Sequence, residues 1–326
     1  MPAMPKVSVI IPVYNVEQYI ERCARSLFEQ TLDDIEYIFV NDCTPDKSME
    51  VLARVLDDYP TRKDQVRIID MPVNSGQAKV RKVGIEAATG DYIIHCDSDD
   101  WVDVTIYEKM WRKAVTEDLD MVICGFFFMD GERIISTNLN DYKGFETLKC
   151  AIIANEIAPS LWSKLIRKGF YNNIDEWPVF NYGEDMAILI PITYQCKSIG
   201  RLDEPLYFYY LNPKGICESI PLSTKIEQQI ANTDFVTQYI TKHGGGKNFH
   251  TELLHRKCSV KMNCWKLPWR EYLSIYPETN LYLLFDSNIS LVEKMGHLTK
   301  CLGIHGISKL FSHGRESQCN NPRLQR

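Results

Sequence analysis

The chain has 326 residues, of which 45% are hydrophobic and 25% charged, and its formal net charge is −6. These values are those of an ordinary globular protein and exclude a disordered, fibrous or disulfide-scaffold chain. Asp and Glu outnumber Lys and Arg up to residue 220, which excludes the basic face that nucleic-acid binding needs there, whereas residues 221–326 are net basic.

The cysteines and the N-terminal run predict a cytoplasmic protein. The eleven cysteines are odd in number and include no C-x-x-C pair, which is typical of thiols in a reducing compartment and does not favour a zinc site. Residues 7–13 predict a buried strand rather than a signal peptide. No stretch approaches the roughly 20 apolar residues that a membrane span needs.

Strands and helices alternate over the first hundred residues. The β-branched run at 7–13 predicts a strand, and Ile20, Cys23 and Leu27 follow it at helical spacing. The same patterns predict further strands at 36–40, 66–69 and 92–95 and helices at 46–56, with Asp46 as N-cap, and at 78–88. Repeated β-α units predict a parallel sheet covered by helices on both faces.

The regular alternation ends after residue 100. The patterns there predict helices at 105–117, 145–156 and 184–194, strands at 121–128 and 206–211, and a hairpin around 131–135. From Leu222 the pattern is helical, with a glycine hinge at 244–246. We therefore expect an α/β domain over residues 1–220 and a small helical C-terminal region over residues 221–326.

Ligands of open parallel sheets bind beyond the carboxyl ends of the strands. The segments that follow the first four predicted strands are 14–17, 41–46, 71–76 and 97–100, and three of the four contain carboxylates. These segments are where we look for a site.

The strongest local pattern is the DSDD run at residues 97–100. Asp97, Asp99 and Asp100 follow a buried strand, and neighbouring carboxylates raise one another's pKa unless they share a cation. Mg²⁺ or Mn²⁺ suits such oxygen ligands and keeps coordination positions open for phosphate. The alternative is a helix N-cap with solvated acids.

Two residues near the first two strands are candidates for binding a nucleotide. Asp42 could accept hydrogen bonds from a ligand, although an aspartate there is more often a turn residue. Tyr14 offers a ring on which a base could stack, or it simply packs against its neighbours.

A basic and an acidic candidate come later in the chain. Arg81 lies one turn into a predicted helix, where its planar guanidinium suits a diphosphate, although a solvated helix face is the ordinary alternative. Glu184 and Asp185 start another predicted helix, where acids are expected from the helix dipole alone. Their functional interpretation is a general base for a sugar hydroxyl.

Taken in order, these motifs resemble those of the family-2 glycosyltransferases of bacterial surface-polysaccharide synthesis. The resemblance covers residues 5 to about 215 and rests on six motifs: PVYN at 12–15, VND at 40–42, a 76–90 helix leaving through ATGDY, DSDD at 97–100, WSKLI at 162–166 and GED at 183–185. Each motif alone is weak, whereas the ordered set is specific.

The resemblance implies a GT-A fold with a mainly parallel central sheet, a UDP-sugar donor, a divalent cation and inversion at the anomeric carbon. It implies donor-binding roles for the residues Pro12, Tyr14, Asn15, Asp42, Arg81, Asp97 and Ser98. It implies metal ligation by Asp99 with Asp97, a catalytic base in Asp185 assisted by Glu184, and acceptor contacts from Trp162 and Lys164. Departures from the family pattern, such as Cys43 in place of Gly and Lys82 in place of Asn, fall largely in the nucleotide loop.

Two rival interpretations remain open at this point. A sugar nucleotidyltransferase would need a Gly-rich basic loop after the first strand, and residues 13–18 contain neither Gly nor a basic residue. A donor-binding subunit that has lost catalysis would keep the fold and bind UDP without releasing it from UDP-sugars.

The C-terminal segment 290–326 is basic and partly amphipathic. It could contact the inner face of the plasma membrane, close to lipid-linked acceptors. A solvated tail is the alternative.

Overall fold

A computed structural model describes residues 5–130, 133–137, 139, 141–215, 219–285 and 291–302. Its centre is a nine-stranded sheet in the order β3-β2-β1-β4-β8-β6-β9-β5, with β7 paired to β6. The strands are β1 (Val7–Val13), β2 (Ile35–Asn41), β3 (Val66–Asp70), β4 (Tyr92–His95), β5 (Trp101–Val102), β6 (Met121–Asp130), β7 (Arg133–Ser136), β8 (Lys164–Arg167) and β9 (Ile199–Tyr210).

Helices flank this sheet, and the C-terminal ones pack on other helices beyond it. The helices that the structure describes are α1 (Ile20–Phe28), α2 (Ser48–Asp57), α3 (Gln77–Ala87), α4 (Ile106–Thr116), α5 (Phe145–Ala154), α6 (Glu184–Gln195), α8 (Leu222–Lys242), α9 (His250–Asn263), α10 (Trp269–Ser274), α11 (Thr279–Phe285) and α12 (Leu291–Cys301). Two 3₁₀ helices, Pro60–Gln65 and Lys168–Asn173, complete the regular structure described.

The first four strands form the parallel half that the sequence predicts. β1 pairs in parallel with both β2 and β4, and β2 pairs in parallel with β3. Beyond β4 the sheet is mixed, because β8 joins β4 and β6 in antiparallel orientation and β5 joins β9 likewise. β6 and β9 again pair in parallel, so the sheet is parallel throughout its first half and mixed beyond it.

The later strands differ in part from their predictions. β9 spans twelve residues where six were expected, and β5 and β8 were not expected because they have only two and four residues. The hairpin around 131–135 is present as β6 and β7, which pair from Asp130 and Arg133 outward. Its turn, residues 131–132, lies outside the described residues.

Two hydrophobic cores lie on opposite faces of the sheet. Side chains alternate along β1, so that Val9 and Ile11 pack with α1, α2 and α4, whereas Ile10 packs with α3, α5 and α6. The second core also contains Val236 of α8 and Leu253 of α9. The helical region therefore shares a core with the α/β part, and the domain boundary at residue 220 stays a prediction.

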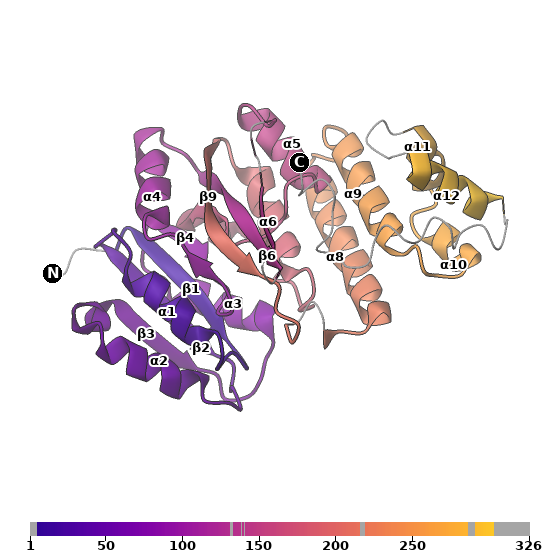
Figure 1. The fold of residues 1–326 in the computed structure, drawn as a ribbon. Coiled ribbons are helices and arrows are strands. Elements are labelled where there is room, and N and C mark those ends of the chain that lie inside the picture. The colour runs from indigo at the N-terminus through magenta and orange to yellow at the C-terminus, as the bar shows by residue number, and fades with distance from the viewer. Residues whose placement is uncertain are drawn as a thin grey trace.

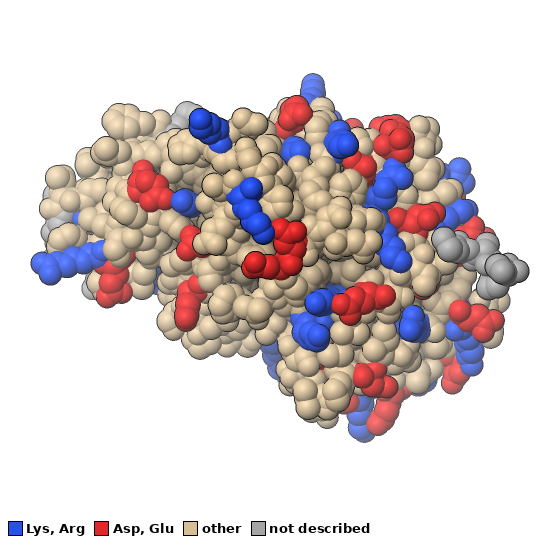
Figure 2. All heavy atoms as spheres, turned by 180° about the vertical axis from the view of Figure 1, so that it is seen from behind, with Lys and Arg blue, Asp and Glu red and all other residues tan. Residues whose placement is uncertain are grey.

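The helical region extends the molecule at one end. Figure 1 shows α9–α12 gathered on the side away from β3. Among the described helices, none is both long enough and apolar enough to cross a bilayer. Figure 2 shows acidic and basic side chains intermixed over the back of the molecule, so the charge asymmetry along the chain does not become a field of one sign on this face.

Candidate active site

The loop after β2 is built around Asp42. Its side chain is buried, and its two carboxylate oxygens accept the backbone N–H groups of Ser75 (2.7 Å) and Gly76 (2.9 Å). Gly76 has φ +81° and faces Asn181 so closely that an added Cβ would lie 2.3 Å from the amide nitrogen. Asp42 therefore orders the loop that leads into α3, and only glycine fits the turn.

The loops after β1 and β2 are joined to each other. Asn15, at φ +56°, donates its backbone N–H to the Thr44 hydroxyl (2.8 Å). Asp46 accepts from the backbone N–H groups of Glu17 (2.9 Å) and Ser48 (3.1 Å) and so fixes the turn before α2. The predicted N-cap Asp46 is wrong, because α2 begins at Ser48 and its N-cap is Lys47.

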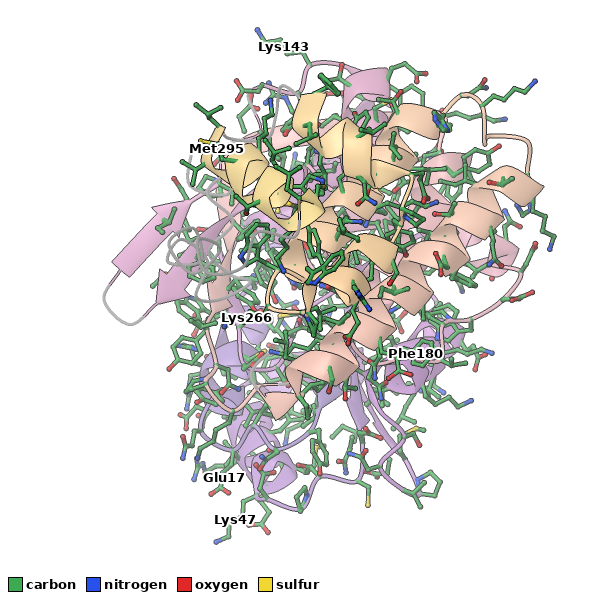
Figure 3. All side chains as sticks on the ribbon, turned by 90° about the vertical axis from the view of Figure 1, so that its right-hand side faces the viewer. Glu17, Lys47, Lys143, Phe180, Lys266 and Met295 are labelled. Carbon is green, nitrogen blue, oxygen red and sulfur yellow. The ribbon has the colours of Figure 1, made fainter. Side chains whose placement is uncertain are left out.

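Tyr14 projects from this edge of the sheet. Its side chain is 47% exposed, and Pro12 behind it is half-buried in β1. Glu17 and Lys47 mark these two loops at the lower end of the view in Figure 3. A ring with this exposure can receive a flat ligand.

The three aspartates after β4 have different partners. Asp100 is fully buried and accepts from the Tyr207 hydroxyl (2.6 Å) and the Tyr210 backbone N–H (2.7 Å), which ties this loop to β9. Asp99 accepts from the Asn212 amide (2.9 Å). Asp97 and Asp99 keep partial exposure, whereas Ser98 between them is buried.

Asp97 and Asp99 are the candidate ligands of a divalent cation. No cluster of three or more His, Cys, Asp or Glu forms a cation cage within the described residues. Two carboxylates still fit Mg²⁺ or Mn²⁺, because such ions keep several water and phosphate ligands. Burial raises the pKa of Asp97 to about 6, against the lowering effect of Arg81 and with further increases from Asp185 and Asp99. A bound cation would relieve this crowding of negative charge.

Arg81 lies behind this cluster and is 1% exposed. Its Nη2 donates to Asp97 Oδ1 (2.9 Å) and its Nε donates to Glu184 Oε1 (3.2 Å). The same Nε forms an ion pair with Asp185 Oδ1 (3.1 Å), and Nη1 lies 3.3 Å from His95 Nδ1. Burial and the arginine charge hold the pKa of His95 well below its usual value, so the ring is neutral and accepts from Nη1.

Glu184 and Asp185 start α6 directly after Gly183, which has φ +81°. Glu184 is buried, whereas the Asp185 side chain is 19% exposed and its Oδ2 accepts the backbone N–H of Leu161 (3.1 Å). Burial and the charge of Asp185 raise the pKa of Glu184 well above its usual value, although Arg81 opposes the shift. The structure thus brings Asp97, Glu184 and Asp185 to one guanidinium.

Trp162 and Lys164 lie beneath the surface of the site. Trp162 is 6% exposed, and its ring stacks on Tyr207 with centroids 4.3 Å apart. Lys164 is 1% exposed and donates to the Ala158 carbonyl (2.5 Å) and the Ser163 hydroxyl (2.9 Å). In this conformation neither side chain offers the open face that an acceptor contact requires.

Several residues of the site were not predicted from the sequence. Asn212 holds Asp99, and its signal was a polar residue just after an aromatic strand. Tyr207 and His95 are members of the expected strands, and nothing local distinguishes them from packing residues. Asn181 accepts from the Ala78 N–H (3.2 Å) and joins the start of α3 to the segment before α6.

A mixed sheet flanked by helices, with an acidic cluster at its strand ends, is the architecture of the GT-A glycosyltransferases. The structure aligns with Staphylococcus aureus TarS 1–349 in complex with UDP-GlcNAc at a TM-score of 0.62 and 16% identity, covering 91% of this chain and 92% of that one. It aligns with the mannosyltransferase PcManGT of Pyrobaculum calidifontis, in complex with GDP-Man and Mn²⁺, at a TM-score of 0.56 and 14% identity, covering 96% and 84%. These likenesses show the GT-A fold.

The sequence relatives give the family. The family model described as "Glycosyl transferase family 2" matches residues 8–184. The chain is 38% identical to the uncharacterised glycosyltransferase YibD of Escherichia coli K12 over 86% of this chain and 77% of that protein. It is 34% identical to the uncharacterised glycosyltransferase EpsJ of Bacillus subtilis 168 over 70% and 67%. The chain belongs to glycosyl transferase family 2, and it is an enzyme that transfers a glycosyl group.

Proposed function

We propose that this enzyme is an inverting, metal-dependent glycosyltransferase that moves a sugar from a UDP-sugar to a carbohydrate hydroxyl during surface-polysaccharide synthesis. The observation that carries the proposal is the meeting of Asp97, from the acidic cluster after β4, and Asp185, from the start of α6, at Arg81. The fold relative TarS binds UDP-GlcNAc and UDP. A sequence relative, 30% identical over 64% of this chain and 23% of that protein, is the minor teichoic acid biosynthesis protein GgaB of Bacillus subtilis.

The donor pocket in this proposal lies at the ends of β1, β2 and β4. The exposed ring of Tyr14 would stack on uracil, with Pro12 and Asn15 shaping the loop beside it. Asp42 would accept from the base while it holds residues 75 and 76, because each carboxylate oxygen can accept more than one hydrogen bond. Asp97 and Ser98 would face the ribose and the phosphates.

The metal in this proposal is Mn²⁺ or Mg²⁺ held by Asp99 and Asp97, which supply oxygen ligands. When bound, such an ion supplies Lewis-acid neutralisation of the charge on the departing diphosphate. Asn212 would orient Asp99 through its 2.9 Å hydrogen bond, and Asp100 would fix the loop through Tyr207 and Tyr210. Such supporting contacts keep ligands in place.

The base in this proposal is Asp185. The acceptor oxygen attacks the anomeric carbon, the bond from that carbon to the diphosphate breaks, UDP leaves, and the hydroxyl proton passes to the Asp185 carboxylate. Oδ1 is buried against Arg81, whereas Oδ2 accepts the Leu161 N–H. A carboxylate oxygen can accept more than one hydrogen bond, so we assign the proton transfer to Oδ2. Glu184 would share the charge of Arg81 and shape the sugar side.

The acceptor side is proposed to rest on Trp162 and Lys164 from below. Trp162 packs under Tyr207 and Tyr209. Burial lowers the pKa of Lys164, and the lysine lies close enough to Asp185 for the carboxylate charge to raise that pKa against the larger effect of burial. The acceptor would be a glycan, free or lipid-linked, contacted by residues above this layer.

A lipid-linked acceptor agrees with the exposed side chains of α11 and α12. Large apolar side chains are exposed on these helices, namely Leu281, Phe285, Leu291, Val292, Met295, Leu298 and Leu302 at its end. Figure 3 shows Met295 on the outer side of this helix pair. Residues 221–326 are net basic. We therefore propose that the enzyme is cytoplasmic and that this end of it contacts the anionic inner leaflet of the plasma membrane. Residues 290 and 303–326 of the expected segment lie outside the described residues.

Vesicle flotation tests the membrane contact. The protein should float with anionic vesicles, and the double variant Leu291→Ser/Met295→Ser should remain at the bottom of the gradient, because it loses exposed apolar contact area. The control is the variant Val73→Ser, which removes an exposed apolar side chain that is distant in the sequence from α12. Equal flotation of the three proteins would exclude α12 as the contact.

The function itself is tested by UDP release from a panel of UDP-sugars with and without Mn²⁺. We expect Mn²⁺-dependent release from one UDP-sugar, which increases when a glycan acceptor is added. Binding of UDP without release from any member of the panel would instead support a donor-binding subunit.

A further inference from the structure

Arg81 is enclosed by the protein rather than open to a ligand. Each of its three side-chain nitrogens has a partner within the chain, and the side chain is 1% exposed. A guanidinium that binds a diphosphate must present free N–H groups to it. The remaining N–H groups of Arg81 are buried with the side chain, so a diphosphate could reach them only if Arg81 or its neighbours moved.

We propose that Arg81 is a positioning residue that couples the donor-side carboxylate of Asp97 to the proposed base Asp185, and that it does not itself bind the diphosphate. The inference rests on the proposed function and adds a coupling between donor binding at Asp97 and proton transfer to Asp185. Nη2 holds Asp97 at 2.9 Å, and Nε lies 3.1 Å from Asp185. The Nε hydrogen itself goes to Glu184 (3.2 Å), so the planar, rigid fork of Nη2 and Nε fixes Asp97 relative to Glu184 by hydrogen bonds, and it attracts the neighbouring Asp185 by charge.

The backbone that carries Arg81 is fixed from two sides. Gly84, one turn further along α3, lies so close to β1 that an added Cβ would be 2.5 Å from the Ile10 side chain. The first turn is tied to the segment before α6, because Trp177 Nε1 donates to the Ala78 carbonyl (2.8 Å) and Asn181 accepts from the Ala78 N–H. Helix α3 therefore holds its position relative to both the sheet and α6.

The charges around Arg81 explain why a displacement of Asp97 would affect Asp185. One cation faces Asp97, Glu184 and Asp185, and neutral His95 closes the remaining side. Like charges repel at short range in a poorly solvated site. A ligand that draws Asp97 outward therefore leaves Arg81 more fully to Asp185 and Glu184. By thermodynamic linkage, a change at Asp185 must alter donor affinity by the same factor by which donor binding alters the equilibrium at Asp185.

The experiment compares Arg81→Lys, which keeps the charge and loses the fork, with Lys82→Met on the adjacent, half-exposed position of the same helix. Calorimetry gives the affinities for UDP and for uridine without metal, where the position of Asp97 as a cation ligand has no effect on binding, and steady-state kinetics with Mn²⁺ give kcat and KM. For Arg81→Lys we expect kcat to fall about 100-fold, while the ratio of UDP affinity to uridine affinity changes by less than about threefold. Lys82→Met should resemble the wild type. A tenfold or larger loss of UDP affinity with unchanged uridine affinity would show that Arg81 binds the diphosphate and would overturn the proposal.

A double-mutant cycle with Asp185→Asn separates positioning from a general loss of structure. If Arg81 acts through Asp185, Arg81→Lys should change the residual kcat of Asp185→Asn by less than about threefold, which is far from additive. Additive effects on kcat would overturn the coupling.

The same cycle measured on urea unfolding needs no activity, so it remains informative even if no UDP-sugar is turned over and the proposed function fails. There, non-additivity supports the coupling and additivity contradicts it. If Arg81→Lys does not fold, the cycle between Asp97→Asn and Asp185→Asn, with Arg81 in place, is measured by the same criterion.

Discussion

Buried charges serve different purposes in two regions of this molecule. At the strand ends, Arg81 is surrounded by three carboxylates from two separate segments. In the helical layer, defined here as α5, α6 and α8–α12, buried cations instead meet backbone carbonyls at helix ends. Arg256 donates to the carbonyls of Ile152 and Ile153 near the end of α5, both at 2.7 Å. Lys149 donates to those of Tyr194 and Cys196 at the end of α6, and Lys261 to that of Ile275 at the end of α10.

The difference is visible in the pKa values. Burial lowers the pKa of Arg256 to about 9 and that of Lys261 to about 8, because carbonyl dipoles only partly replace water. Burial would also lower the pKa of Arg81, but Asp185, Asp97 and Glu184 reverse the direction and raise it. A cation at a helix end stabilises the fold, since it satisfies carbonyls that have no partner within the helix. A cation among acids instead sets the geometry of groups that can react, so damage to the two regions should appear in different measurements.

The largest expected effect lies at the strand ends. Asp185→Asn should lower kcat by about 10²–10⁴-fold, because the acceptor hydroxyl loses its proton acceptor, while calorimetry still shows UDP binding. Glu86→Gln, which changes an exposed acid on α3, is the matched control and should leave kcat unaltered. Full activity of Asp185→Asn would show that this residue is not the base, and that the carboxylates around Arg81 do not differ from the helical layer in their effect on catalysis.

The next effect lies in the helical layer. Arg256→Met should lower the free energy of unfolding by about 2–4 kcal/mol, because two buried carbonyls lose their donors, and kcat of the folded protein should stay near that of the wild type. Urea unfolding and UDP release measure the two quantities. Lys242→Met, at a 64% exposed side chain paired with Asp175, should change stability by less than about 0.5 kcal/mol. A loss of kcat in Arg256→Met without a loss of stability would contradict the division between the regions.

Lys164 sharpens the comparison, because it is a buried cation close to the catalytic side. Burial lowers its pKa to about 7, below the ordinary value of about 10.4. Between these values the unfolded state binds more protons than the folded state, so the free energy of unfolding should rise with pH, by up to about 1.4 kcal/mol per pH unit. Below the folded pKa both states are protonated and this contribution to the slope vanishes. Urea unfolding at pH 7.5 and 9 should show that Lys164→Met reduces the rise; an identical rise in both proteins would mean that the ammonium stays charged.

The smallest expected effect concerns Asn212, whose part in the site is indirect. Asn212→Ala should raise the Mn²⁺ concentration for half-maximal activity about tenfold, because Asp99 loses the contact that orients it. Uridine affinity, measured by calorimetry, should not change. An unaltered Mn²⁺ requirement would argue against Asp99 as a metal ligand.

The sequence predicts the first half of the fold better than the second, for a physical reason. β1 to β4 are marked by β-branched runs, and the segments between them have apolar residues at helical spacing. The structure confirms these elements. β5 and β8 are too short to show a period, and their place in the sheet depends on partners that are distant in the sequence. The candidate acids could be found because each follows a strand or starts a helix.

Their surroundings could not be predicted in the same way. Arg81 stands next to Lys82 and locally resembles a solvated helix face; only the packing of α3 against β1 and α6 turns it inward. The WSKLI motif likewise says nothing of the Tyr207 ring that covers Trp162, because Tyr207 comes from β9. Burial of this kind is decided by tertiary contacts, which residue spacing along one segment does not contain.

The contact between Leu161 and Asp185 has a consequence for how related enzymes would diverge. The donor is a main-chain amide, so it survives any exchange of the Leu161 side chain for another apolar one that fits the core. Only proline would delete it, because proline lacks an N–H. Aligned sequences can therefore vary at this position without losing the contact, and a search for invariant side chains would overlook a group that touches the proposed base.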